Sequence, residues 1–283
     1  MNRRRLVRVP ASSANLGPGF DVLAAALSLH VEVEVVETGR FGVRTDLRIA
    51  RDRRNLCVRG FARLHDPGRF EFRIRSDVPL SGGLGTSAAA YVAGLLAADS
   101  MFELDADVLA IATELEGHPD NVAAALHGGF VACVDGVVTR IGVPPELEAV
   151  LVVPSEAVRT KQARAALPEH VPMADAVFNI GRTAELLLGL ERGDLSLVAR
   201  GLGDRLHQPH RAHLYPRSAA LVEAAAGLGA LGATISGAGP TVLVWTHFAA
   251  TGRVVEALRE RCAGWAEVMR VPFSEHGADV REL

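Results

Sequence analysis

Lysine is nearly absent from this chain of 283 residues, in which Lys161 is the only lysine among 30 basic side chains. The common phosphate-binding loop ends in Gly-Lys-Ser or Gly-Lys-Thr, so it needs a lysine beside its glycines. Lys161 follows no glycine-rich stretch, which excludes a phosphate loop of that type. Any phosphate site must draw its positive charge from backbone amides, a metal ion or arginine.

Cysteine is also scarce, with only Cys57, Cys133 and Cys262. An odd number of widely spaced cysteines argues against a disulfide framework and against a cysteine-based metal motif. Each lies among apolar residues, as a buried thiol would, and a reducing compartment fits. No apolar run approaches the roughly 20 residues of a spanning helix, and the start of the chain is too charged for a signal peptide. We therefore expect a cytoplasmic protein with no membrane partner.

Positive charge is not in excess, because the formal net charge is −3. Nucleic acid is therefore not an expected partner, and Arg3-Arg4-Arg5 is too short to be a binding arm. The apolar fraction of 49% and the charged fraction of 22% are those of a soluble globular protein. At this length the chain can form one large domain or two ordinary ones.

Apolar periodicity predicts a mixture of strands and helices. Strands are expected at 6–9, 31–36, 41–49, 70–75, 131–134, 137–141, 150–153, 233–235, 242–245 and 266–271. Helices are expected near 55–64, 86–98, 105–115, 120–127, 159–167, 173–190, 194–202, 217–228 and 253–261, with a further apolar helix directly after residue 21. Helices fall between strands in both halves, so the fold is α/β or α+β, and Pro144-Pro145 is a plausible joint.

The most informative stretch is VPLSGGLGTSAAA at 78–90. Its glycines allow backbone N–H groups to approach a ligand closely and tolerate positive φ. A helix that begins near Thr86 brings unpaired N–H groups and a partial positive charge to the same point. The stretch therefore predicts an anion site, most naturally for phosphate, although a turn that only caps a helix has the same composition.

Two other segments are polar and rich in turn residues. One is PASSANLGPGFD at 10–21, and the other is ISGAGPT at 235–241. Taken singly, the first is an ordinary loop with Asx turns and the second a tight connection between strands.

In this order the three motifs resemble the three signatures of the GHMP kinases. The similarity is greatest to the homoserine kinase family, through PASSANLGPGFD at 10–21, EGHPDNVA at 116–123, TKQARAALP at 160–168, DRLHQPHRAHLYP at 204–216 and ISGAGPT at 235–241. At position 86 this chain has threonine where the family often has serine, and at position 124 it has alanine where many members have proline. The resemblance implies an α+β fold of two domains: an ATP-binding domain at 1–150 with a left-handed βαβ crossover, and a ferredoxin-like domain at 151–283.

The resemblance also implies a magnesium–ATP donor and L-homoserine as acceptor, giving O-phospho-L-homoserine for threonine biosynthesis, in a homodimer. The loop should wrap the phosphates through Pro79, Leu80, Ser81, Gly82, Gly83, Leu84, Gly85, Thr86, Ser87, Ala88 and Ala89. Ser87 and Glu116 are the implied ligands of Mg²⁺, which binds few protein oxygens. Glu114 lies close enough along the chain to be the acid instead.

The acceptor carries an ammonium, a carboxylate and a hydroxyl, and each needs a partner. Asp21 is expected to bind the ammonium, and Arg164 and Arg211 the carboxylate, with Arg182 and Arg205 as alternatives. Asn15, His118, Asp120, Asn121 and Gly237 would complete the site.

The mevalonate kinase branch has a catalytic aspartate where this chain has Asn121, which cannot be a base at neutral pH. Asn121 is therefore expected to orient the hydroxyl, with Asn15 and Thr86 beside it, and catalysis would come from positioning and charge stabilisation. His207, His210 and His213 are expected at the surface or around the substrate.

Three other functions stay open from the sequence. The chain could be a GHMP kinase for a different small alcohol, although Asn121 and the HPDN run at 118–121 argue against a mevalonate-type member. It could be a non-catalytic binding protein that has kept the fold, although its motifs are intact. A dinucleotide oxidoreductase fits less well, because the loop lacks the G-x-G-x-x-G spacing.

Overall fold

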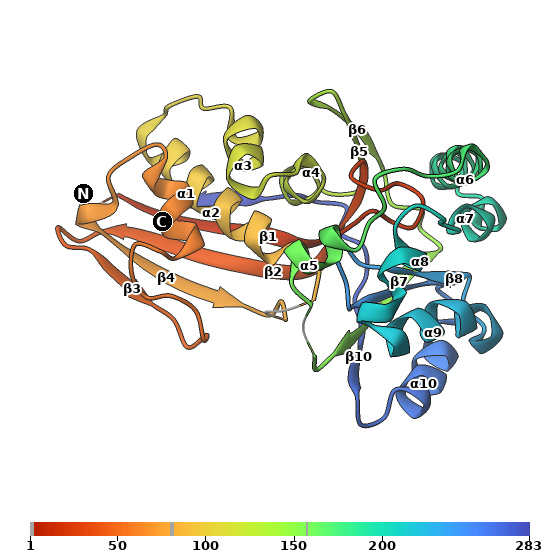
Figure 1. The fold of residues 1–283 in the computed structure, drawn as a ribbon. Helices are drawn as coiled ribbons and strands as arrows, with labels where there is room; N and C mark the ends of the chain where they lie inside the picture. Colours follow the sequence, from red (N-terminus) through yellow and green to blue (C-terminus); the bar gives the residue numbers. More distant parts are fainter. Residues whose placement is uncertain (1–2, 80–81, 157) are drawn as a thin grey trace.

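The computed structural model describes residues 3–79, 82–156 and 158–283. Its strands form two sheets, one in each half of an elongated molecule (Figure 1). The strands are β1 (Arg4–Ala14), β2 (Leu23–Glu37), β3 (Gly42–Arg44), β4 (Phe70–Ser76), β5 (Phe130–Val134), β6 (Val137–Ile141), β7 (Leu147–Pro154), β8 (Gly232–Ile235), β9 (Val242–His247), β10 (Ala266–Arg270) and β11 (Asp279–Glu282). The helices are α1 (Leu56–Ala62), α2 (Thr86–Phe102), α3 (Val108–Glu116), α4 (Pro119–His127), α5 (Thr160–Ala165), α6 (Met173–Arg192), α7 (Leu195–Gly201), α8 (Gln208–Arg211), α9 (Pro216–Ala224) and α10 (Thr251–Arg261). Short 3₁₀ turns lie at Pro67–Arg69, Ala212–Leu214 and Ala225–Leu228.

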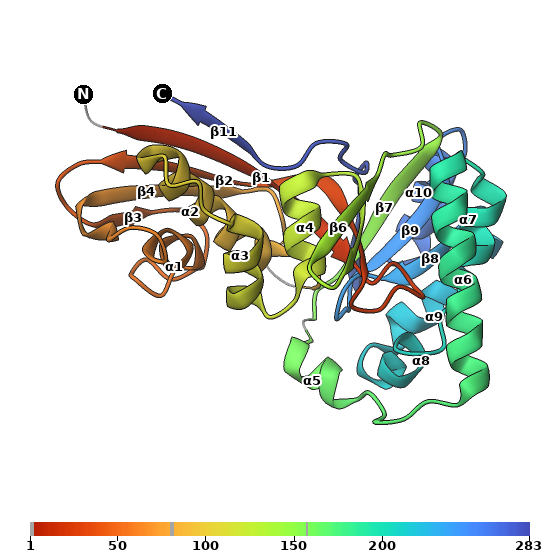
Figure 2. The ribbon, with the colours of Figure 1, turned by 90° about the horizontal axis from the view of Figure 1, so that it is seen from above.

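The first sheet has the order β11-β1-β2-β4-β3, and the β5–β6 hairpin pairs with the start of β2. Helices α1 to α4 lie along one face of it (Figure 2). In β2, Val31, Val33 and Val35 are buried toward the helices and alternate with more exposed residues, as a half-buried strand requires. β3 and β4 are parallel and are bridged by α1, which forms a βαβ unit; the left-handed crossover stays a prediction.

The second sheet has the order β10-β7-β9-β8, and each neighbouring pair is antiparallel. Along the chain its strands follow a β-α-β-β-α-β sequence, with helices between β7 and β8 and α10 between β9 and β10. This arrangement is ferredoxin-like, so the predicted fold of the second half is confirmed.

Two local expectations were wrong, and one strand was not expected. Residues after Asp21 form the start of β2 and not a helix, and Leu23 to Leu27 are buried. A continuous apolar run that is covered on both faces has no period that separates a strand from a helix. The strand expected at 41–49 is limited to Gly42–Arg44, and β11 was not expected at all.

The end of the chain returns to the first half. β11 pairs with β1 in an antiparallel register, and Ser274 N–H donates to the Ala26 carbonyl at 2.9 Å. The sheets therefore do not divide the chain at one point, and the domain boundaries at 1–150 and 151–283 stay a prediction. Among helices of the described ranges, none combines the length and apolarity needed to cross a bilayer.

Candidate active site

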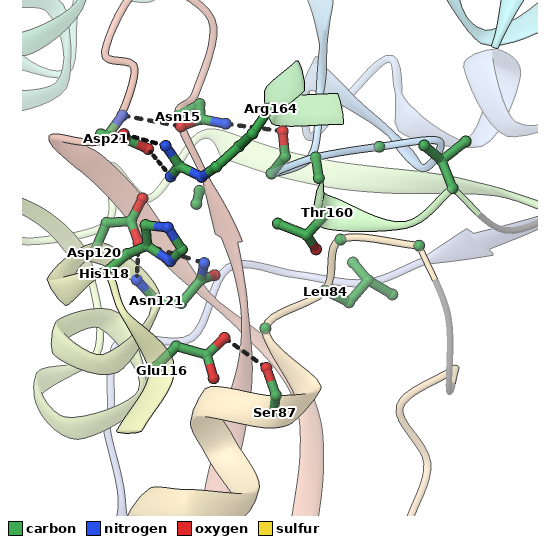
Figure 3. Close-up of a pocket in the computed structure, with 18 of the residues that line it drawn as sticks. Asn15, Asp21, Leu84, Ser87, Glu116, His118, Asp120, Asn121, Thr160 and Arg164 are labelled. Atoms are coloured by element: carbon green, nitrogen blue, oxygen red, sulfur yellow. Dashed lines mark hydrogen bonds and ion pairs between the residues drawn. The ribbon is translucent and has the colours of Figure 1, made fainter. Parts of the chain in front are cut away.

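A cavity of about 620 Å³ lies where the two halves meet. Residues from both halves line it. They come from the β1–β2 connection, the glycine loop, the segment between α3 and α4, the segment around α5, and the third motif, which is ISGAGPT at 235–241. The lining residues are Ala14, Asn15, Phe20, Asp21, Gly82, Gly83, Leu84, Gly85, Thr86, Ser87, Glu116, His118, Asp120, Asn121, Val158, Arg159, Thr160, Arg164, Arg211, Gly237, Ala238 and Gly239. Figure 3 shows Asp21 and Arg164 at one end, Ser87 and Glu116 at the other, and Asn121 between them.

The glycine loop has a backbone that glycine alone adopts easily. Gly82, Gly83 and Gly85 have φ of 110°, 83° and 61°. Gly85 is the N-cap of α2, and no side chain caps this helix, so its first N–H groups are available to an anion. Of the expected phosphate residues, 82–87 line the cavity, whereas Ala88 and Ala89 are buried inside α2 and Pro79 lies outside the lining. Leu80 and Ser81 lie outside the described residues.

The third motif holds this loop in place from the second half of the chain. Ser236 Oγ donates to the Gly83 carbonyl at 2.6 Å, and Thr241 N–H donates to the Gly82 carbonyl at 3.3 Å. A Cβ on Gly83 would overlap the carbonyl oxygen of Ser236. The glycine loop and the segment 235–241 therefore fit together only with glycine at position 83. In 235–241 only Gly237 was predicted to have a role.

Ser87 and Glu116 form the polar end of the cavity. Ser87 Oγ donates to Glu116 Oε1 at 2.5 Å, across from the start of α2 to the end of α3. Burial raises the pKa of Glu116, and the hydrogen bond from Ser87 opposes this only in part. Two hard oxygen donors beside the glycine loop fit Mg²⁺, which binds few protein oxygens and keeps several waters as ligands.

Glu114 has a different environment. Its carboxylate pairs with Arg63 at 2.7 Å on the exposed side of α3, and it does not line the cavity. The geometry therefore favours Glu116. The described residues contain no cluster of three or more His, Cys, Asp or Glu side chains that could hold a metal by themselves.

The start of α4 brings three expected acceptor residues into the middle of the cavity. Pro119 begins the helix, as its lack of an N–H allows, and His118, Asp120 and Asn121 line the cavity. Ser12 Oγ donates to Asn121 Oδ1 at 2.8 Å, which fixes the side-chain amide. Burial raises the pKa of Asp120 to about 6 and lowers the pKa of His118, to which Arg164 contributes.

Asp21 and Arg164 were expected to bind opposite charges of the acceptor, and the structure pairs them with each other. Arg164 donates to both carboxylate oxygens of Asp21, at 2.8 and 3.0 Å. Asn15 supports this end, because its Oδ1 accepts from Asp21 N–H at 3.0 Å and its Nδ2 donates to the Gly237 carbonyl at 2.8 Å. The pair has no net charge and presents one carboxylate and one guanidinium to the cavity.

Arg211 is 1% exposed and also lines the cavity. Its Nε donates to the Ala163 carbonyl at 3.0 Å, which fixes the guanidinium. The alternatives Arg182 and Arg205 lie over the ring of Phe178 and pair with nearby acids, away from the cavity lining.

Several contributors were missed by the sequence analysis. Ser12, Phe20, Thr160 and Ser236 line the cavity or hold residues that do, and all lie inside the motifs that carried the resemblance. His207 was expected at the surface or around the substrate, but its side chain is completely buried, so the surface alternative was wrong. Apolar spacing gives no signal for a buried polar side chain, and only the motif could have found it.

A second cavity of about 350 Å³ adjoins the glycine loop. Its walls are mostly apolar, and Thr86 and Ser87 line both cavities. The apolar walls come from Val31, Leu47, Ile49, Ala50, Leu56, Ile74 and Ala90. A flat apolar group attached to a phosphate chain would fit such a cavity.

Comparison with known proteins gives a consistent result. Residues 53–129 match the GHMP kinases N terminal domain and residues 186–264 match the GHMP kinases C terminal domain. The chain is 40% identical over 256 residues to the homoserine kinase of Moorella thermoacetica, covering 85% of this chain and 86% of that one. It is 41% identical over 271 residues to the homoserine kinase of Gloeobacter violaceus, covering 89% and 91%.

Solved structures agree with these sequence matches. The homoserine kinase of Cytophaga hutchinsonii superposes with a TM-score of 0.88 at 31% identity, over 99% of this chain and 98% of the other. A mevalonate kinase superposes with a TM-score of 0.73 at 13% identity, over 96% of this chain and 99% of the other. The second similarity shows the shared fold alone.

Proposed function

The chain belongs to the homoserine kinases of the GHMP kinase family, and we propose that its central cavity transfers the γ-phosphoryl group of ATP to the hydroxyl of L-homoserine. The product, O-phospho-L-homoserine, is the one expected for threonine biosynthesis. The observation that carries the proposal is the order of groups along one cavity. An anion-binding glycine loop occupies one end, a paired acid and arginine occupy the other, and a fixed amide lies between them.

The nucleotide would bind with its phosphates on the amides of 82–87. Because Thr86 and Ser87 line both cavities, a triphosphate in the loop allows the base to enter the apolar neighbour. Leu80 and Ser81 stay predicted phosphate residues. No lysine is needed, because the helix start and the loop amides supply partial positive charge.

Mg²⁺ would be held by Ser87 and Glu116, and it would offset the negative charge that the phosphates bring. Glu116 must be ionised to do this. Burial raises the pKa of Glu116, and a bound cation would favour its carboxylate form again.

The acceptor would bind at the opposite end. Asp21 would receive its ammonium, and Arg164 and Arg211 its carboxylate, while Asn15, His118, Asp120 and Gly237 surround it. Binding requires Asp21 and Arg164 to exchange part of their mutual contact for contacts to the zwitterion. This exchange keeps the charge of the site balanced, so an amino acid suits the site better than a singly charged molecule.

Asn121 would orient the hydroxyl toward the phosphate. Its amide is fixed by Ser12, and an amide cannot take a proton at neutral pH. The reaction would therefore depend on alignment and on charge stabilisation by the loop amides, with Thr86 and Asn15 beside the reacting groups.

We also propose that the protein is a homodimer, and that it acts in the cytoplasm. One exposed face of α6 carries an apolar stripe of Met173, Val177, Ile180, Gly181, Ala184 and Leu188. Met173 and Ile180 are 79% and 70% exposed, and the small residues in the middle allow close approach of another helix. α6 lies at the outer edge of the second half in both views (Figures 1 and 2). A two-fold axis would pair this stripe with itself.

The dimer is tested by the mass in solution of Ile180→Glu beside Val137→Glu. Val137 is similarly exposed, at 65%, but lies on the β5–β6 hairpin. We expect a dimer for the wild type and Val137→Glu, and a monomer for Ile180→Glu. A monomeric wild type contradicts the proposal, and so does a dimeric Ile180→Glu.

The activity is tested by ADP formation with L-homoserine, with and without Mg²⁺. Two truncated acceptors sharpen the test: 3-aminopropan-1-ol lacks the carboxylate and 4-hydroxybutyrate lacks the ammonium. Mevalonate, galactose and L-threonine represent other alcohols. We expect fast ADP formation only with L-homoserine and Mg²⁺, and slow turnover of both truncated acceptors. Equal turnover of mevalonate or galactose would contradict the assignment, and no turnover with any alcohol would favour a binding protein.

A further inference from the structure

The connection 15–21 between β1 and β2 has an unusual backbone and carries three lining residues, Asn15, Phe20 and Asp21. Asn15, Leu16 and Asp21 have φ of 72°, 48° and 56°. Non-glycine residues persist in this left-handed region only where their surroundings hold them. Within the connection, Asp21 N–H donates to Asn15 Oδ1 and Gly19 N–H donates to the Asn15 carbonyl, each at 3.0 Å; further support comes from outside it.

Side chains of the second half of the chain supply that support. His207 Nε2 donates to the Gly17 carbonyl at 2.8 Å. Asn179 Nδ2 and Thr183 Oγ1, both on α6, donate to the Pro18 carbonyl at 3.2 and 3.3 Å. None of these three belongs to the cavity lining formed by the described residues, so they act on the connection and not on a ligand.

His207 also faces Arg211. Its Nδ1 lies 3.4 Å from Arg211 Nη1, and a guanidinium only donates, so Nδ1 is the acceptor nitrogen. The Gly17 carbonyl only accepts, so Nε2 carries the proton. The ring is thus a neutral imidazole with both nitrogens engaged, in agreement with burial, which lowers the pKa of His207.

Asp204 fixes this arrangement from behind. Its side chain is fully buried. It accepts from Asn179 Nδ2 at 2.8 Å and from the backbone N–H groups of His207 and Gln208 at 3.1 and 2.7 Å, and its Oδ2 lies 3.5 Å from His207 Nε2. One carboxylate therefore contacts two of the three residues whose side chains reach the Gly17 and Pro18 carbonyls, Asn179 and His207. A buried network in which each group is satisfied has one well-defined geometry.

We propose that His207 is a positioning residue of the acceptor site, which sets the spacing between Arg211 and the connection that bears Asp21. The two groups serve opposite charges of the same small molecule, so their spacing decides whether both can be contacted at once. The inference rests on the proposed function, because that function assigns the carboxylate and the ammonium to these groups.

The test compares His207→Leu with His207→Gln. Leucine removes both hydrogen bonds, whereas a glutamine amide can still donate to Gly17 and accept from Arg211. For His207→Leu we expect the KM for L-homoserine to rise about tenfold, the loss expected for one buried hydrogen bond that aligns the site. The KM for ATP should stay within about twofold of the wild type, since the loop at 82–87 is not touched. His207→Gln should recover most of the loss.

A second readout separates positioning from general damage. The preference for L-homoserine over 3-aminopropan-1-ol and over 4-hydroxybutyrate should shrink in His207→Leu, because only an acceptor with both charges depends on the spacing. If that variant does not fold, Thr183→Val removes one donor to Pro18 and should raise the same KM about threefold. His213→Gln is the control, since His213 is exposed in the same segment and should change nothing.

The possible results are distinguishable. A KM for L-homoserine unchanged in His207→Leu, an equal rise of both KM values, or an unchanged preference over the truncated acceptors would overturn the inference. If His207→Leu does not fold, an unchanged KM for L-homoserine in Thr183→Val would also overturn the inference. A wild type without homoserine-dependent ADP formation would instead remove the proposed function.

Discussion

Replacing Gly83 by alanine tests the idea that backbone amides hold the nucleotide. Gly83 has a φ of 83°, and an added Cβ would overlap the Ser236 carbonyl oxygen. The overlapped atom is backbone, so it cannot rotate away. The loop must move by on the order of 1 Å, and a displacement of that size can lower a rate about 100-fold.

The cost in stability can be separated from the cost in activity with a matched control. Gly39 has a φ of 81°, but an added Cβ there has no neighbour within 4 Å. Both variants therefore carry the left-handed penalty of about 1–2 kcal/mol. Gly83→Ala adds an overpacking cost of about 1–3 kcal/mol, so its free energy of unfolding should be lower than that of Gly39→Ala by that amount.

The assays are steady-state kinetics with varied ATP and thermal unfolding. We expect Gly39→Ala to keep the kcat/KM for ATP of the wild type, and Gly83→Ala to lose about 100-fold. If Gly83→Ala is folded and keeps kcat/KM for ATP within about threefold, a difference of well under 1 kcal/mol, the loop is not the phosphate site. Equal losses in both variants would show that the left-handed penalty alone is responsible.

Three further predictions follow from single side chains. Asn121→Ala should lower kcat about 100-fold, as the loss of one aligned donor does. Ser12→Ala removes only the hydrogen bond that fixes the Asn121 amide, so its kcat should fall less. An unchanged kcat in Asn121→Ala would contradict the orienting role. Glu116→Gln should weaken the apparent Mg²⁺ affinity in kinetic titrations by about 10–100-fold, and Glu114→Gln should not; the opposite order would move the metal site to Glu114. Asp120→Asn should raise the free energy of unfolding, and by up to about 3 kcal/mol more at pH 7 than at pH 4. The reason is that burial raises the pKa of Asp120 in the folded protein to about 6, above the ordinary 3.8. The wild type therefore loses stability as the pH rises from the lower pKa value to the higher one, and the variant does not. Denaturant unfolding at both pH values checks this, and a gain that is the same at both would refute it.

Much of the fold could be predicted from the sequence because its helices and half-buried strands have clear periods. The exceptions have physical causes. The start of β2 is apolar on both faces, since it lies between β1 and β5 under α4, so it has no strand period. β11 consists of four mostly exposed residues, and its pairing with β1 depends on a chain end that returns from the other half.

The candidate site was predictable as a set of residues but not as a set of contacts. The motifs pointed to Asp21, Arg164, Ser87 and Glu116 as residues of the site. Spacing along the chain cannot show that Arg164 forms an ion pair with Asp21, or that Arg63 forms one with Glu114. These outcomes depend on which elements the two halves bring together. Both Glu114 and Glu116 lie on α3, and only the tertiary structure shows that Glu116 is the one that lines the cavity.

The pairing of Asp21 with Arg164 also bears on selectivity. A site with two separated, unpaired charges would attract any ion of the right sign, whereas here each charge is already neutralised by the other. A ligand with only an ammonium or only a carboxylate would have to separate this pair and leave one member without its counter-charge. Both side chains are more than a third exposed, so water screens the pair and the loss is about 1 kcal/mol or less. A zwitterion would replace both contacts at once. In the proposed acceptor site the ion pair would therefore add a modest preference for molecules that carry both charges, and the hydrogen bonds that hold the connection 15–21 would keep Asp21 in place for them.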